Sequence, residues 1–157
     1  MSTLNTSWSL GGVPVENRVL LAPLAGIGNW FVRLQAKRYG AGLTVSEMIS
    51  SHGLAYGDKR TRNEFLRLHP EEGPTSVQLF GADPAIMREA AAMVAETGAK
   101  IIDLNMGCPV KKVCRTGAGH LLLATEGEGD LALQDREHLL EVVAVRRRPS
   151  PVGNGHV

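Results

Sequence analysis

The chain has 157 residues, a length typical of one domain with a modest core. Hydrophobic residues make up 43% and charged residues 21%, and the net charge of +1 gives no strong basic field of the kind that indicates nucleic acid. Residues 1–124 carry 13 basic against 10 acidic residues, a net of +3, whereas residues 125–157 carry 4 against 6, a net of −2. Charge therefore neither excludes nor indicates an RNA partner.

The sequence favours an intracellular setting. Two cysteines are too few for a disulfide scaffold, which points to a reducing compartment. No segment has the length and apolarity of a membrane span, and residues 1–8 lack the basic-then-apolar pattern of a signal peptide. We therefore expect a cytoplasmic protein with no membrane partner.

The first predicted elements alternate between strand and helix. An entry hairpin or loop over residues 10–17 precedes the short apolar run 18–22, which suits a strand buried on both faces. Asn29 is placed to cap a helix over residues 30–39. Residues 43–46 form the second strand candidate.

The same alternation continues through the middle of the chain. Short helices are expected within residues 47–68, and residues 75–80 form a third strand candidate. Asp83, followed by proline in the first helical position, begins a helix that ends at Gly98. With a fourth strand at residues 100–104, the order predicts parallel strands joined by helical crossovers.

The region after Gly119 differs in composition. Residues 125–157 are rich in charge and glycine, and within them residues 130–145 could form one amphipathic helix. The end of the chain, residues 147–157, is predicted to be an unstructured tail. We therefore divide the chain into a folded part, residues 1–124, and a divergent part, residues 125–157.

Three short segments follow directly after predicted strands, at residues 22–26, 78–81 and 105–109. Ligands of parallel α/β folds bind at this edge of the sheet. Cys108 is the most informative residue there. A free cysteine is most often simply buried, but Lys111, Lys112 and Arg115 lie within seven residues, and nearby positive charge favours a reactive thiol.

Other interpretations of these residues are weaker. Cys108, Cys114 and His120 are spaced six and six, without the close pairing that zinc sites need, so no metal is expected. Gln78 is equally well a structural strand-end amide or an amide that binds the edge of a ring such as a flavin. Gly117 and Gly119 match no full phosphate-loop pattern and indicate only a turn.

Taken together, four segments resemble the tRNA-dihydrouridine synthase family. They are APLAGIGN (22–29), SEMIS (46–50), SVQLFGADP (76–84) and DLNMGCPVKKVCRTGAG (103–119). The last is the most specific, since the family signature contains an Asn-x-Gly-Cys-Pro core with a downstream Gly-x-Gly. The resemblance covers about residues 10–124.

The resemblance implies a (β/α)8 TIM barrel with FMN at its C-terminal mouth, NADPH as reductant and tRNA as substrate. In that family the flavin passes hydride to C6 of a uracil, and a cysteine protonates C5. By motif, Cys108 is this acid, Gln78 hydrogen-bonds the flavin ring, and Asn105 lies near flavin and uracil. The segment against the flavin is matched by Pro23, Leu24 and Ala25.

The chain also departs from the family pattern. A (β/α)8 barrel needs roughly 250 residues, and four parallel strands make only its N-terminal half, so the α/β fold is expected to be incomplete. The family's flavin lysine, histidine, phosphate-binding loops and C-terminal tRNA-binding domain have no matching position, and the match is lost after Gly119. Truncation or a changed reading frame would produce such an ending and would impair activity. The fourth strand would then have an unpaired edge that favours self-association.

Two alternatives to a tRNA-dihydrouridine synthase stay open. One is another FMN-dependent barrel oxidoreductase that acts on a free pyrimidine, although the Asn-x-Gly-Cys-Pro context counts against it. The other is an inactive fragment that binds RNA weakly or not at all.

Overall fold

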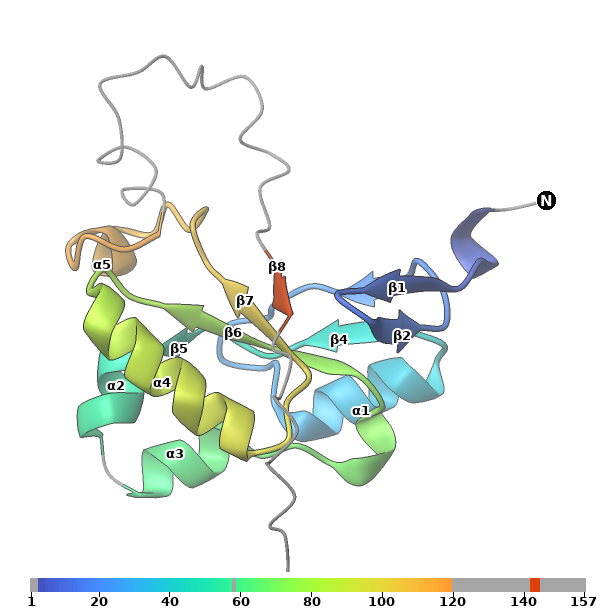
Figure 1. Ribbon diagram of the computed structural model, residues 1–157, viewed down its shortest axis with the longest axis horizontal. Coiled ribbons are helices and arrows are strands. Elements are labelled where there is room, and N and C mark those ends of the chain that lie inside the picture. The colour runs from blue at the N-terminus through green and yellow to red at the C-terminus, as the bar shows by residue number, and fades with distance from the viewer. Residues whose placement is uncertain (1–2, 58, 120–141, 145–157) are drawn as a thin grey trace, which may run out of the picture.

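The computed structural model describes residues 3–57, 59–119 and 142–144 (Figure 1). Four strands lie parallel and pair in chain order, and their apolar residues are mostly buried, as short apolar runs predict. They are β3 (Leu20–Leu21), β4 (Leu43–Val45), β6 (Thr75–Phe80) and β7 (Ile101–Leu104). The predicted parallel arrangement is therefore confirmed.

Two further strands join this sheet. The two-residue strand β5 (Ile49–Ser50) pairs parallel with the end of β6. The strand β8 (Val142–Ala144) pairs antiparallel with β7. Two expectations are thereby corrected: the outer edge of β7 is paired, and residues 142–144 form a strand where a helix over residues 130–145 was predicted.

The rest of that predicted helix, residues 130–141, and the predicted tail, residues 147–157, lie outside the described residues. A helix prediction from apolar spacing considers only local sequence. The hydrogen bonds that β7 offers at its edge are long-range, and they select a strand at residues 142–144.

The helices lie along one side of the sheet, as Figure 1 shows for α1, α2, α3 and α4. Their starts follow from capping: Asn29 accepts hydrogen bonds from the first amides of α1, and Asp83 does the same for α4. The α-helices are α1 (Trp30–Arg38), α2 (Ser51–Tyr56), α3 (Lys59–Phe65), α4 (Pro84–Glu96) and α5 (Lys111–Cys114). Two 3₁₀ turns complete them, η1 (Thr3–Asn5) and η2 (Pro70–Glu72). None of the described helices is both long and apolar enough to cross a membrane.

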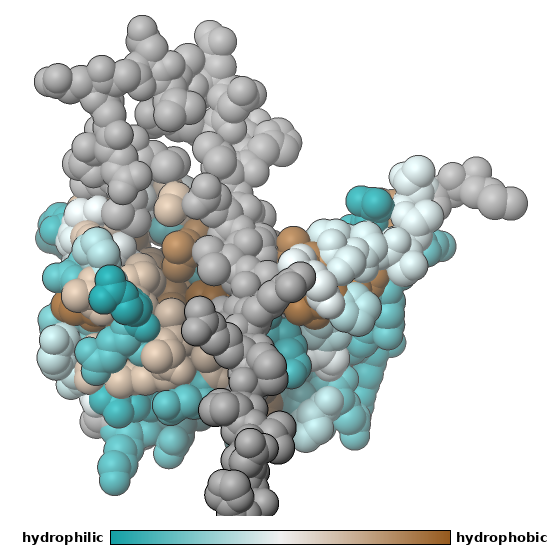
Figure 2. Space-filling model, in the orientation of Figure 1, coloured by the Kyte–Doolittle hydropathy of each residue, from teal (hydrophilic) through white to brown (hydrophobic). Residues whose placement is uncertain are grey.

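The main core lies between the sheet and helices α2 and α4. Its buried members include Leu54 of α2, Leu79 of β6 and Val94 of α4. Met87 and Met93 of α4 are partly buried and pack against this core, and apolar surface gathers over this helix in Figure 2. This packing fixes β6 and β7, the two strands that lead to the candidate site.

A hairpin closes the opposite end of the sheet. It consists of β1 (Trp8–Leu10) and β2 (Val13–Val15), the entry hairpin expected near residues 10–17. Val15 packs with Leu43 and Ile101, which begin β4 and β7. The strand beginnings are therefore covered, and the loops after the strand ends lie at the other edge.

One buried ion pair ties α1 to the turn before β6. Arg33 and Glu72 have side chains only 2% and 1% exposed, with Nε 2.8 Å from Oε2. Arg33 also donates to the carbonyls of Gly28 and Arg67, and Glu72 accepts from the hydroxyl of Thr75. A buried ion pair is tolerated only when its hydrogen bonds are satisfied in this way.

The described units are consecutive strand–helix repeats with parallel strands and helices outside. This is the N-terminal half of a (β/α)8 TIM barrel, the predicted fold class.

Candidate active site

The loops after β6 and β7 are held side by side. Leu79 pairs with Leu104, and the amide of Asn105 continues the ladder by donating to the carbonyl of Leu79 at 2.8 Å. Parallel strands end at one edge, so the side chains that follow them converge there. The motif of residues 105–109 therefore begins beside the end of β6.

Four predicted or adjacent residues form one hydrogen-bonded chain. The Cys108 amide donates to Asn105 Oδ1 at 3.0 Å, and Asn105 Nδ2 donates to Gln78 Oε1 at 3.0 Å. Gln78 Nε2 in turn donates to Asp103 Oδ2 at 2.5 Å. Three residues predicted from the sequence, Cys108, Asn105 and Gln78, thus meet in one network.

Asp103 determines how the side-chain amides of Gln78 and Asn105 are oriented in this network. The carboxylate only accepts, so it orients the NH2 of Gln78 toward itself and the Gln78 carbonyl toward Asn105. Asn105 must then turn its own NH2 toward Gln78, which leaves its oxygen for the Cys108 amide. Sequence reasoning missed this role of Asp103; the available signal was a carboxylate inside an otherwise apolar strand.

Asp103 is only 3% exposed. Burial raises the pKa of the Asp103 carboxyl above its ordinary value, and the hydrogen bond from Gln78 opposes that rise. Its second oxygen, Oδ1, is buried without a hydrogen-bond partner among the described residues. The side chain therefore keeps one free acceptor next to the network that positions Cys108.

The backbone of Gln78 is fixed from the neighbouring strand. Its amide donates to Ser46 Oγ at 3.0 Å, and that hydroxyl donates to the Glu47 carbonyl at 2.8 Å. Met48, in the same segment, has its sulfur 3.8 Å from Asn105 Nδ2. The segment after β4 thus supports the site from a third strand, a function that sequence reasoning did not assign.

The cysteine loop depends on a glycine. Gly119 has a φ of +67°, and a Cβ there would lie 2.5 Å from the Cys108 carbonyl oxygen, so only glycine fits. Cys114 Sγ lies 3.5 Å from the same carbonyl oxygen, and neither thiol is in a disulfide. The downstream glycine of the motif therefore packs against the backbone of the half-buried Cys108.

Three basic side chains lie near the cysteine loop. Lys111 and Lys112 are exposed on α5, and Arg115 follows at its end, so all three face solvent near the cysteine loop. Within the described part of the chain, no three His, Cys, Asp or Glu side chains cluster as metal ligands would. His120, the third residue of the discarded zinc interpretation, lies outside the described residues.

The loop after β3 holds Pro23, Leu24 and Ala25. The Leu24 carbonyl accepts from the amide of Gly28 at 2.7 Å, and a Cβ on Gly28 would lie 2.8 Å from that oxygen. Glu47 Oε2 accepts from the amide of Gly26 at 2.9 Å. This tight turn is thus tied to the segment that touches Asn105.

The sequence matches a known family and several curated proteins. The family model for dihydrouridine synthase (Dus) matches residues 20–134, well over half of the chain. The tRNA-dihydrouridine synthase B of Pseudomonas aeruginosa is 44% identical over 117 residues, covering 74% of this chain and 35% of that protein. The Pasteurella multocida tRNA-dihydrouridine synthase B is 46% identical over 116 residues, covering 73% of this chain and 34% of that protein.

The chain thus spans about a third of the length of these curated relatives. Among solved structures, a variant of NCR from Zymomonas mobilis matches with a TM-score of 0.51 and 19% identity, over 67% of this chain and 45% of that one. A likeness at this identity concerns the fold, and it agrees with the half-barrel. On its sequence matches, the chain belongs to the dihydrouridine synthase family.

Proposed function

We propose that this chain carries the proton-donating part of a tRNA-dihydrouridine synthase site, which reduces uridine in tRNA to 5,6-dihydrouridine. The observation that carries the proposal is the hydrogen-bonded chain from Asp103 through Gln78 and Asn105 to the Cys108 amide. It fixes a thiol-bearing loop at the sheet edge where barrel enzymes bind their ligands. A tRNA substrate also agrees with the expected cytoplasmic location.

The residues at this edge fit the ring of a flavin. The Gln78 side chain makes one hydrogen bond through Nε2 and one through Oε1, so part of its amide capacity is left for a ring edge. The Asn105 amide is occupied by Gln78, Met48, Gly107 and Cys108, so its contribution is to hold Gln78 and the cysteine loop in place. Pro23, Leu24 and Ala25 form an apolar turn after β3, at the same edge of the sheet. FMN, reduced by NADPH, is accordingly the proposed cofactor, and when bound it supplies the hydride.

The protein's own contribution is positioning and a proton. As hydride adds to C6 of the uracil, Cys108 Sγ–H gives its proton to C5, and the resulting thiolate regains a proton from solvent. The Asn105 bond to the Cys108 amide holds the loop in place during this transfer. Lys111, Lys112 and Arg115 lie where they could contact phosphates of the RNA.

The test uses a chimera, because the chain covers about a third of its relatives. Residues 1–119 replace the matching segment of the Pseudomonas aeruginosa relative, and dihydrouridine is measured in tRNA after incubation with FMN and NADPH. Cys108→Ala should slow its formation about 100- to 10,000-fold, the usual contribution of a general acid. Oxidation of NADPH should change little, since that step needs no proton at C5.

Cys114→Ala is the matched control, because this second thiol lies close to Cys108 and contacts the Cys108 carbonyl oxygen. It should leave tRNA reduction nearly unchanged. If both cysteine variants reduce tRNA as fast as the parent, Cys108 is a structural cysteine. Reduction of free uridine in preference to tRNA would instead favour the free-pyrimidine alternative.

We expect the chain alone to bind FMN weakly. A flavin phosphate is normally held at a loop or helix N-terminus, but the starts of α1 and α4 are occupied by the caps Asn29 and Asp83. Purified chain loaded with FMN should therefore lose its flavin absorbance on dialysis. A stoichiometric flavin spectrum after dialysis would contradict this prediction.

A further inference from the structure

Two cysteines lie in the segment that follows β7. Cys108 belongs to the loop of the candidate site, and Cys114 is the last residue of α5. Figure 1 shows α5 on the side toward which β6 and β7 point. Both cysteines are partly exposed, and neither is in a disulfide. The proposed reaction uses only Cys108, so it does not explain a second thiol beside it.

The two residues are close in space. Cys114 Sγ lies 3.5 Å from the Cys108 carbonyl oxygen. Because a carbonyl oxygen is about 2.4 Å from its own Cα, Cys114 Sγ is at most about 6 Å from Cys108 Cα. In a disulfide even the two Cα atoms are about 4.4–6.8 Å apart. The two sulfurs are therefore within reach of one another through rotation of their side chains.

The backbone around the two cysteines is fixed on one side and open on the other. The Cys114 amide donates to the Val110 carbonyl at 3.0 Å, which holds Cys114 in the turn of α5. The backbone of Gly119 packs against the Cys108 carbonyl. Gly107, by contrast, has no atom within 4 Å of the place where a Cβ would lie. The Cys108 side chain therefore has space to turn on the Gly107 side.

The surroundings of the two thiols differ. Cys114 donates its S–H to the Cys108 carbonyl oxygen, and a thiol held in this way retains its proton. Only the deprotonated thiolate attacks an electrophile. Cys108 is in a partly exposed loop with Lys111, Lys112 and Arg115 nearby in the chain, the basic setting in which cysteines react. We therefore expect Cys108 to be oxidised first.

We propose that Cys108 and Cys114 form an oxidation site, at which a peroxide converts the two thiols to a disulfide. The Cys108 thiolate attacks hydrogen peroxide, so that an S–O bond forms, the O–O bond breaks, and hydroxide leaves and is protonated to water. Cys114 then loses its proton to solvent and attacks the Cys108 sulfur. The S–S bond forms, the S–O bond breaks, and a second hydroxide leaves as water. Two thiols are oxidised by two electrons, and one peroxide is reduced to two waters.

The second thiol makes this oxidation reversible. A sulfenic acid with no neighbouring thiol is oxidised further to sulfinic acid, which thiols do not reduce, whereas a disulfide is reduced by a dithiol. Transient disulfides of this kind occur in reducing compartments. On the proposed function, the disulfide removes the proton that Cys108 gives to C5, so uridine reduction stops until the disulfide is reduced. Cys114 thus protects the proton donor.

The test treats the reduced full chain, at low protein concentration, with an equimolar amount of hydrogen peroxide. We expect intact-mass spectrometry to show the loss of two hydrogens and thiol titration to show the loss of both thiol groups. A proteolytic digest should contain the peptides of Cys108 and Cys114 joined by a disulfide within one chain. Dithiothreitol should restore both thiol groups.

Two serine variants separate the roles of the cysteines. Cys114→Ser should gain one oxygen at Cys108, as a sulfenic acid that dimedone traps, and then a second oxygen that dithiothreitol does not remove. Cys108→Ser is the matched control, and its remaining thiol should persist at the same peroxide dose. The circular dichroism of both variants should equal that of the parent, since serine is close to cysteine in size.

Three results would each overturn the proposal: both thiol groups persisting in the treated parent, disulfides only between chains, or sulfinic acid forming at Cys108 as fast in the parent as in Cys114→Ser. None of these results would touch the proton-donor assignment of Cys108, because peroxide oxidation requires neither flavin nor tRNA. Conversely, a chimera inactive on tRNA whose parent chain still forms the disulfide would count against the proposed reaction alone.

Discussion

Two buried polar networks flank β6, and they are completed to different degrees. In the first, both oxygens of Glu72 are used: Oε2 accepts from Arg33 and Thr75, and Oε1 accepts from Arg33 and the His69 amide. In the second, Asp103 uses Oδ2 for Gln78 and leaves Oδ1 without a partner in the described structure. All the carboxylate oxygens of the first network are hydrogen-bonded, as expected for a network that stabilises the fold. The second network continues into the Cys108 loop and keeps one unused acceptor.

The largest expected effect comes from breaking the first network. Glu72→Ala leaves the Arg33 guanidinium buried without its partner, which should lower the free energy of unfolding by about 3–5 kcal/mol. Urea denaturation followed by circular dichroism measures this loss. A variant as stable as the parent would show that the Arg33–Glu72 network does not stabilise the fold.

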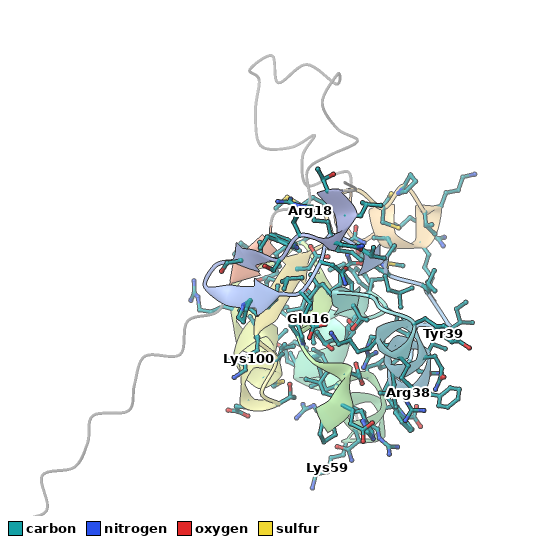
Figure 3. The ribbon with its side chains drawn as sticks, turned by 90° about the vertical axis from the view of Figure 1, so that its right-hand side faces the viewer. Glu16, Arg18, Arg38, Tyr39, Lys59 and Lys100 are labelled. Carbon is teal, nitrogen blue, oxygen red and sulfur yellow. The ribbon has the colours of Figure 1, made fainter. Side chains whose placement is uncertain are left out.

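The control for that variant is a surface ion pair of similar length. Lys37 Nζ lies 2.6 Å from Glu16 Oε2, but the Glu16 side chain is 73% exposed. Glu16→Ala should change the free energy of unfolding by about 0–1 kcal/mol, because an exposed pair is solvated and screened. Figure 3 labels Glu16 in the ribbon's N-terminal part.

The second network should respond to pH instead. Burial raises the pKa of Asp103, so between its ordinary value and the raised value the folded protein binds more protons than the unfolded chain. Stability therefore falls as pH rises through that window. Asp103→Asn removes the titration while keeping an oxygen for Gln78, so its stability relative to the parent should increase with pH.

Urea denaturation of both proteins from about pH 4 to about pH 8 measures this difference. A difference that stays constant with pH would mean that Asp103 has no raised pKa. Asp103→Asn also tests whether the carboxylate sets the orientation of the Gln78 amide, since an asparagine amide can donate to Gln78 as well as accept from it. A mixture of Gln78 orientations should then appear as doubled amide signals for Asn105 in NMR spectra.

A smaller effect than that of Glu72→Ala is expected for two asparagine variants. Asn105→Ala removes the acceptor for the Cys108 amide, a bond worth about 1 kcal/mol, so hydrogen exchange at that amide should accelerate about fivefold. Asn29→Ala should lower overall stability by about 1 kcal/mol through loss of the α1 cap. It should not affect the Cys108 amide more than its neighbours. Equal exchange at Cys108 in both variants would contradict the positioning role.

The helices and strands predicted correctly from the sequence are those specified by residues close together in the chain. The apolar runs at residues 75–80 and 100–104 gave β6 and β7, and the caps Asn29 and Asp83 gave the starts of α1 and α4. Each depends on residues within a few positions of one another. Chain order then sufficed to predict parallel pairing.

The contacts that the sequence did not predict join residues that are far apart in the chain. Arg33 and Glu72 are 39 positions apart, and no periodicity connects an arginine within a helix to a glutamate in a later turn. Gln78 and Asp103, 25 positions apart, meet only because β6 and β7 pair in register. The motif predicted that Cys108, Asn105 and Gln78 would gather, but not the carboxylate that orients them.

The antiparallel strand β8 has a consequence for assembly. Any strand from another molecule that adds to β7 must first displace β8, which pairs there from Ile101 to Asp103. A strand tethered to its own sheet has an effective concentration on the order of millimolar. Association through this edge would therefore be a competition between β8 and the added strand for the same three residue pairs of β7.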